Sequence, residues 1–213
     1  MRIAVVGATG RTGKELVSQA LADGHEVVAY VRRPEAVAPT PGLTVVGGQL
    51  DDEATLTDAL GGCDAVAVAL GNPVTKASAP LMQIAMPTVI AAAKGAGVRR
   101  VVVLSALGVG ATLANARYPY RFGCRTFLAG NFRDHHAGES LLESSGLDWT
   151  TIHPGPLFDG ARTPHPTIID AALGRQMPRA PRTMRADVAA AMLGMLTDPT
   201  TVGKQMLITS VQR

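Results

Sequence analysis

Three glycines near the start of the chain have the spacing of a loop that holds phosphate groups. Gly7, Gly10 and Gly13 lie between an apolar run and the first helical pattern of the sequence. In such a loop the first glycine permits a tight turn, the second lets a pyrophosphate approach the backbone, and the third lets the helix pack on the sheet. Free N–H groups at the helix start would hold the phosphates. The pattern predicts a dinucleotide site, and a glycine turn without a ligand is the alternative.

Two adjacent arginines follow the second apolar run, where the ribose of a bound dinucleotide would lie. A site selective for NAD carries an acidic residue there, which hydrogen-bonds the ribose 2′-hydroxyl. This chain has Arg32 and Arg33 instead, and guanidinium groups suit the 2′-phosphate of NADPH. One or two charge-assisted hydrogen bonds of about 1.5–3 kcal/mol each would favour NADPH roughly ten- to a thousandfold. The sequence therefore predicts NADPH as cofactor, the alternative being a solvated arginine pair.

The elements that position these residues alternate along the chain. Strands are expected at 3–6, 26–31, 43–46, 64–70, 101–104, 149–152 and 205–209, and helices at 10–23, 53–60, 80–96, 131–145 and 187–196. This alternation, with continuously apolar strands, predicts an α/β fold: a doubly wound parallel (Rossmann) sheet covered on both faces. Ligands of such sheets bind beyond the carboxyl ends of the strands. Residues 108–130 and 155–185 fit no element and are expected to be substrate-shaping loops.

Composition narrows the class of protein. The chain has 213 residues, 46% of them hydrophobic, which suits a single domain over residues 1–213 with one sizeable core. A net charge of +3 and only 4% aromatic residues argue against a nucleic-acid partner. From the apolar runs and the first residues we expect neither a transmembrane segment nor a secretory leader. Cys63 and Cys124 form neither a disulfide framework nor a metal-ligand pattern. We expect a cytoplasmic protein, monomer or homodimer, that binds a small-molecule substrate and no metal.

Short motifs spread over the chain carry a family resemblance. They are VVGATGRTG at 5–13, VRRP at 31–34, VLSA at 103–106, SGLDWT at 145–150, HPGPL at 153–157 and RADVA at 185–189. In this order and spacing they resemble the atypical short-chain dehydrogenases/reductases. Within these, the likeness is to the NAD(P)H-binding group that contains biliverdin-IXβ reductase/flavin reductase and the NmrA-like proteins.

The resemblance implies a cofactor lying across the strand ends. The residues that it implies are Gly7, Thr9, Gly10, Arg11, Thr12 and Gly13 for the pyrophosphate, Arg32 and Arg33 for the 2′-phosphate, Leu50 and Asp51 for the adenine, Leu70, Gly71 and Asn72 for the ribose, and Ser105, Pro154, Gly155, Pro156 and Leu157 for the nicotinamide. Gln49 stands where the family pattern has an acidic residue, a departure that bears on adenine recognition.

The proton-transferring pair of typical short-chain dehydrogenases, Tyr-x-x-x-Lys, is missing, because no tyrosine of this chain has a lysine four positions later. Counted from Glu139, which resembles a glutamate of the family, the pair would fall at Asn131 and His135. His135 is the candidate proton donor. Ser105, expected under the nicotinamide, is the candidate hydrogen-bond donor to the amide or a substrate oxygen. A polar helix face and a strand cap are the respective alternatives. His153 stands where the family often has arginine, which suggests structural support at least as much as catalysis.

The sequence therefore predicts an NADPH-dependent oxidoreductase that transfers a hydride to a planar acceptor such as a flavin or a quinone. A flavin takes the hydride on its ring and can take the proton from solvent, so it needs no tyrosine. One alternative is a narrow-substrate ketone or enone reductase that uses His135 or Ser105. Others are a non-catalytic, NmrA-like redox sensor, which the short chain disfavours, and an epimerase or dehydratase that recycles NAD, which the arginine pair disfavours.

Overall fold

The computed structural model describes residues 1–72 and 80–211, which build one long sheet and a small two-stranded one. The order across the long sheet is β3 (Leu43–Gly47), β2 (Glu26–Val31), β1 (Arg2–Val6), β4 (Ala65–Val68), β5 (Arg100–Leu104), β6 (Asp148–Pro154), β10 (Lys204–Thr209) and β8 (Thr167–Asp170). All neighbouring pairs are parallel except β10 and β8. The chain reverses its direction of travel across the sheet between β1 and β4, which is where such folds bind ligands. The predicted α/β doubly wound fold is confirmed.

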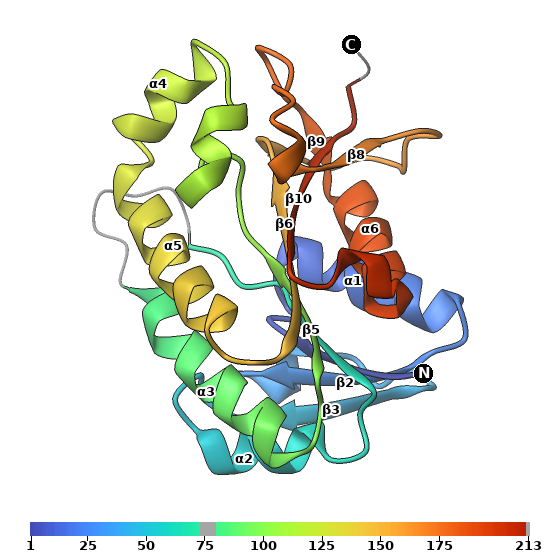
Figure 1. Cartoon of the computed structure of the whole chain (residues 1–213). Coiled ribbons are helices and arrows are strands. Elements are labelled where there is room, and N and C mark those ends of the chain that lie inside the picture. Colours follow the sequence, from blue (N-terminus) through green and yellow to red (C-terminus); the bar gives the residue numbers. More distant parts are fainter. Residues whose placement is uncertain (73–79, 212–213) are drawn as a thin grey trace.

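Helices cover both faces of the sheet (Figure 1). One face carries α1 (Arg11–Ala22) and α6 (Arg185–Thr197), and the other carries α2 (Glu53–Leu60), α3 (Leu81–Gly95) and α5 (Ala129–Glu143). Alternate residues of β1 enter the two layers: Ile3 and Val5 pack toward α1 and α6, and Ala4 and Val6 toward α2 and α3. Burial on both faces explains why the strands are continuously apolar. None of the helices in the described residues is long and apolar enough to cross a membrane.

The two unassigned stretches contain short elements. Residues 108–130 include a 3₁₀ turn at Gly110–Asn115 and the helix α4 (Tyr120–Arg125), and residues 155–185 include β7 (Leu157–Phe158), β8, a 3₁₀ turn at Ala171–Leu173 and β9 (Thr183–Met184). Further 3₁₀ turns lie at Pro34–Ala36 and Pro199–Thr201. The antiparallel edge strand β8 departs from the all-parallel prediction. It pairs with β10 on one side only, so its sequence lacks the apolar run of a central strand.

Helix α5 is fixed to α3 by a buried carboxylate and a glycine. Asp134 of α5 accepts hydrogen bonds from the backbone N–H groups of Met82 and Gln83 at 2.9 and 3.1 Å. It thereby caps the first turn of α3 from another helix, where a negative charge is also favoured by the helix dipole. One turn further along α5, a Cβ on Gly138 would come within 3.0 Å of the Met82 Cβ and the Met86 Cγ. The close approach and the cap together set the position of α5.

We therefore expect Asp134→Ala to destabilise the protein by about 1–3 kcal/mol, because it leaves two N–H donors at the start of α3 without their acceptor. The free energy of unfolding is measured by urea denaturation. Asp58→Ala removes an exposed carboxylate of α2 and should change stability by less than about 0.5 kcal/mol. Equal effects of the two variants would contradict the capping role of Asp134.

Candidate cofactor and active site

A pocket of about 350 Å³ opens at the carboxyl ends of β1, β2 and β4. Residues predicted for the cofactor that line it are Gly7, Thr9, Gly10, Arg32, Leu50, Leu70, Gly71 and Asn72, joined by Tyr30, Val31, Gly48, Ala69 and Leu81. The structure therefore brings together residues predicted for the pyrophosphate, the ribose and the adenine, which come from the loops that follow separate strands of the sheet. The nicotinamide residues lie outside this pocket, at the ends of β5 and β6.

The glycine loop has the geometry that its sequence indicates. Gly7 has a φ of +90°, and a Cβ there would lie 2.8 Å from the Ala69 carbonyl oxygen. A Cβ on Gly13 would overlap the Gly7 carbonyl. Gly10 precedes α1 and caps it without a side-chain hydrogen bond. The first N–H groups of α1 are thus left for an external acceptor such as a phosphate.

The arginine pair lies at the rim of the pocket. Arg32 and Arg33 are both exposed, and neither takes part in an ion pair in the described part of the chain. Of the two, only Arg32 lines the pocket, and the lining contains no carboxylate. No carboxylate in the wall of the pocket would therefore oppose a 2′-phosphate beside Arg32, and the neighbouring Asp51 and Asp52 act on Tyr30 from outside that wall.

Other predicted cofactor residues lie around the pocket rather than in its wall. The Thr12 side chain and Gly13 are buried beneath the loop, and Asp51 is exposed outside the lining. The Arg11 side chain points to Asp159, with an Nη1–Oδ2 distance of 3.2 Å. Sequence reasoning missed Tyr30, whose hydroxyl donates a 2.8 Å hydrogen bond to the Gln49 carbonyl. That bond holds the loop that carries Leu50. The sequence did not indicate this role, because a single tyrosine at the end of a strand belongs to no motif.

The residues predicted to flank the nicotinamide lie together where β5 and β6 end. The Ser105 N–H donates to the Ile152 carbonyl and the Leu107 N–H to the Pro154 carbonyl, both at 2.8 Å. Gly155 is buried and packs on Pro181, and Leu157 pairs with Thr183 in the small sheet of β7 and β9. Pro156 is exposed.

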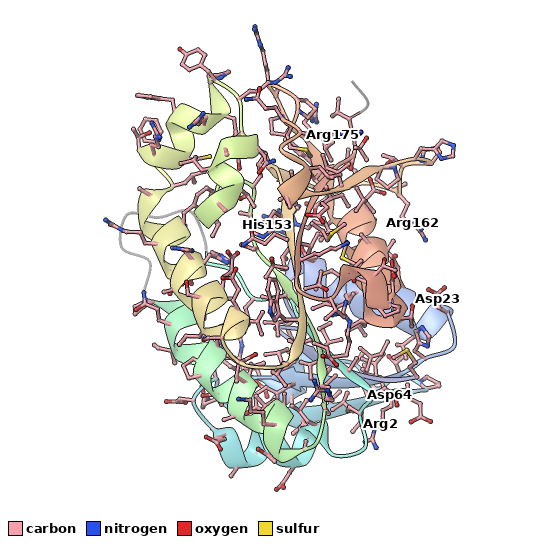
Figure 2. All side chains as sticks on the ribbon, in the orientation of Figure 1. Arg2, Asp23, Asp64, His153, Arg162 and Arg175 are labelled. Carbon is pink, nitrogen blue, oxygen red and sulfur yellow. The ribbon has the colours of Figure 1, made fainter. Side chains whose placement is uncertain are left out.

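Two titratable side chains meet behind these strand ends. The side chains of His153 on β6 and Glu139 on α5 are 0% and 1% exposed, and the His153 Nε2 lies 3.8 Å from the Glu139 Oε1. Figure 2 shows His153 at the centre of the molecule. Its Nδ1 lies 3.1 Å from the Ala106 carbonyl oxygen, and its Nε2 lies 2.8 Å from the Thr151 hydroxyl. Because a carbonyl only accepts, Nδ1 carries the proton, and Nε2 of the neutral ring accepts from Thr151.

Burial favours the uncharged forms of this cluster. Burial raises the pKa of Glu139 from its ordinary 4.5 to about 7, and lowers the pKa of His153 from 6.5 to about 4. It also lowers the pKa of His135, against a smaller opposing effect of Asp134. The neighbouring Ser105 hydroxyl acts to lower the pKa of Glu139, although its Oγ lies beyond ordinary hydrogen-bond geometry. Between about pH 4 and pH 7, Glu139 thus mostly holds its proton beside an uncharged His153.

Several buried polar atoms here lack a partner among the described residues: the Ser105 Oγ, the His135 Nδ1 and both Glu139 carboxyl oxygens. His135 and Glu139 share a face of α5, one turn apart. Buried polar atoms normally find a partner, so this cluster suits contact with bound water or ligand and the transfer of a proton. From the sequence, Glu139 served only as the position from which His135 was counted, and it was not identified as a functional residue. The spacing of four residues, which places Glu139 and His135 on one face of a helix, was the signal that could have identified it.

Comparison with known proteins gives one family model, described as NAD(P)H-binding, that matches residues 7–199. A (4-alkanoyl-5-oxo-2,5-dihydrofuran-3-yl)methyl phosphate reductase of Streptomyces griseus is 32% identical over 200 residues, covering 90% of this chain. The chain spans 63% of that relative's length, so the assignment of residues 1–213 to a single domain stays a prediction.

Two solved structures illustrate the likeness in fold. ChuY, an anaerobilin reductase of Escherichia coli O157:H7, has a TM-score of 0.82 at 24% identity, covering 100% of this chain and 98% of its own. A short-chain dehydrogenase/reductase of Veillonella parvula in complex with NADP also has a TM-score of 0.82, at 18% identity, covering 98% and 94%.

The raised pKa of Glu139 predicts a pH-dependent effect of Glu139→Gln on stability. Between pH 4.5 and about 7 the native state keeps a proton that the unfolded state releases, so this carboxyl makes the wild type less stable as pH rises. Glu139→Gln has no carboxyl at this position, so its stability does not decrease with pH for this reason. Its stability relative to wild type should therefore increase by up to about 3 kcal/mol from pH 4.5 to 8.

Urea denaturation at pH 5 and pH 8 measures this difference. Glu35→Gln, a change at an exposed glutamate in the 3₁₀ turn after β2, is the control and should keep the pH profile of the wild type, because Glu35 has no part in raising the pKa of Glu139. A Glu139→Gln stability difference that stays constant with pH would contradict the buried, protonated carboxyl.

Proposed function

The chain belongs to the NAD(P)H-binding family, and on that premise we propose that it is an NADPH-dependent oxidoreductase that transfers a hydride to a planar acceptor such as a flavin or a quinone. One observation supports NADPH most directly: a pocket at the carboxyl ends of β1, β2 and β4 has Arg32 in its wall and no carboxylate. An anionic ligand with a 2′-phosphate fits that charge pattern.

The residues present divide the work of holding this cofactor. The N–H groups that follow Gly10 bind the pyrophosphate, and the Arg32 guanidinium, with Arg33 beside it, binds the 2′-phosphate. Leu70, Gly71 and Asn72 border the ribose in the same pocket. Bound NADPH supplies the hydride. Ser105 and the turn after Pro154 orient the end from which the hydride leaves.

A planar acceptor is supported by the absence of the tyrosine–lysine pair. The helix that would carry the pair has Asn131 and His135 at its positions. A flavin or quinone ring takes up the hydride and spreads the resulting negative charge over its conjugated system, so the reacting atom needs no side-chain acid and solvent can supply the proton that completes the reduction.

The buried cluster favours a second candidate, a ketone or enone reductase. The protonated Glu139 carboxyl, His135 and Ser105 together form a proton source where no tyrosine is present. As the hydride bonds to carbon, a proton passes from Ser105 or His135 to the acceptor oxygen, and Glu139 replaces it. Glu139 is then left as carboxylate and recovers its proton from solvent, which balances the reaction. The name of the Streptomyces relative, a reductase of an alkanoyl- and oxo-substituted compound, supports this candidate.

Replacing Arg32 and Arg33 together by Ala should weaken NADPH binding roughly ten- to a thousandfold and leave NADH binding within about threefold, because only NADPH carries the phosphate that they contact. Dissociation constants for both nucleotides are measured by titration of nucleotide fluorescence. Arg162→Ala, a change at an exposed arginine outside the pocket (Figure 2), should leave both unchanged. Equal losses for NADPH and NADH would remove the 2′-phosphate assignment.

His135→Ala separates the two acceptor classes. We expect anaerobic oxidation of NADPH by FMN, followed at the NADPH absorbance band with NADH as parallel donor, to fall less than about threefold. A loss of more than about a hundredfold, the scale of general acid catalysis, would instead make His135 the acid, which is the role that the ketone or enone reductase candidate gives it. His136→Ala, at the adjacent exposed position of α5, is the matched control.

A further inference from the structure

A second hollow, of about 450 Å³, lies between the two segments that the sequence left unassigned. Its lining is Ala116, Arg117, Tyr118 and Arg121 from the first segment and Gln176 and Arg179 from the second. It lies at the same end of the molecule as α4, as do the labelled Arg175 and the segment that precedes β9 (Figures 1 and 2). This is the end of the molecule beyond β5 and β6, where a substrate would approach the nicotinamide site.

The floor of this arginine hollow is built from buried contacts that join the two segments. Asn115 is 3% exposed, and its side-chain amide donates to the carbonyls of Ala171 and Arg175 at 3.2 and 2.9 Å. The backbone carbonyl of Asn115 accepts a hydrogen bond from the Met177 N–H at 2.8 Å. Met177 and Ala116 are both buried in one apolar cluster. These contacts join the two segments that carry the arginines, so the segments do not behave as two independent loops.

The charges of the hollow are of one sign. Arg117, Arg121 and Arg179 line it without any carboxylate, and none of the three takes part in an ion pair within residues 1–72 and 80–211. The Arg117 Nε donates to the Gln176 side-chain oxygen at 3.0 Å. The Arg121 Nε is buried and has no acceptor among the described residues. Like charges gathered in a hollow raise the local concentration of anions, and a buried N–H requires an acceptor.

We propose that this hollow binds an acidic group, a phosphate or a carboxylate, carried by the hydride acceptor. The proposal rests on the proposed reductase function and adds to it the chemical class of the substrate. Guanidinium groups match the oxygens of both acids in a forked geometry. Tyr118, 75% exposed at the wall of the hollow, offers its ring to the planar part of the same molecule.

The test follows the arginine Nε–H signals of ¹⁵N-labelled, NADP⁺-saturated protein by NMR, so that the dinucleotide site is filled. Phenyl phosphate, benzoate and uncharged phenol are titrated separately. We expect the Arg117, Arg121 and Arg179 signals to move together and saturably with the two anions, more tightly with the dianionic phosphate, and not with phenol. The relative affinities of phosphate and carboxylate distinguish the two sources of the acidic group.

Arg121→Gln should weaken phenyl phosphate binding at least tenfold, and Arg179→Gln, at an exposed position less involved in packing, should weaken it severalfold. Arg125→Gln is the matched control, because Arg125 lies on the same helix outside the hollow, and should change affinity less than twofold. Unmoved signals in the wild type, or equal affinity in Arg121→Gln and Arg125→Gln, would overturn the proposal.

A kinetic comparison of FMN with riboflavin, which lacks the phosphate, connects the hollow to the reaction. We expect Arg121→Gln to raise the KM for FMN about tenfold and to leave that for riboflavin unchanged; a rise equal for both flavins would overturn the role of the hollow in substrate binding. Movement of the three NMR signals without reduction of either flavin would keep the anion site and remove flavins from the proposed function. The two failures are therefore distinguishable.

Discussion

The candidate active site of this protein depends on one constraint, the burial of the Glu139 carboxyl group, which has no hydrogen-bond partner among the described residues. An ionised Glu139 beside the fully buried His153 would cost several kcal/mol of lost hydration. The group avoids most of that cost by keeping its proton. His153 then has to be neutral as well, and the Ala106 carbonyl on one side and the Thr151 hydroxyl on the other fix its tautomer. The result is a neutral polar cluster where a charged pair would be expected from residue types alone.

Helix packing determines where this cluster lies. Asp134 and Gly138 hold α5 against α3 from positions next to His135 and Glu139. A buried hydrogen-bonded cap and a close backbone approach leave α5 little freedom to slide, so both side chains keep a fixed distance from β6. The positions of Glu139, His135 and His153 are therefore fixed by a helix and a strand, which hold side chains more precisely than loops do.

The candidate cofactor pocket could be located from the sequence because the residues that form it are local in the chain. The turn at Gly7, the start of α1 and the arginines after β2 each follow an apolar run directly, and parallel strands bring their carboxyl ends to one edge. Other features depend on contacts between distant residues. The edge strand β8 pairs with one neighbour only, and Asn115 joins segments about sixty residues apart. Glu139 lies against His153, which comes from a strand that follows its helix in the chain. No local pattern encodes such pairings, so the sequence indicated Glu139 and His153 only through their place in family motifs.

The charges of these sites are consistent with one another. The lining of the cofactor pocket with Arg32 and the lining of the arginine hollow both hold arginine and no carboxylate, whereas the cluster of Glu139 and His153 is uncharged as long as Glu139 keeps its proton. An ionised carboxylate at this place would repel an anionic acceptor and oppose the negative charge that hydride addition brings to it. Protonation of Glu139 thus avoids the cost of burying a charge, and in the proposed reaction it would also leave no carboxylate charge to oppose an anionic acceptor. A proton stored there is also the species that a carbonyl acceptor would need, so the electrostatic and the chemical roles of the residue favour the same protonation state.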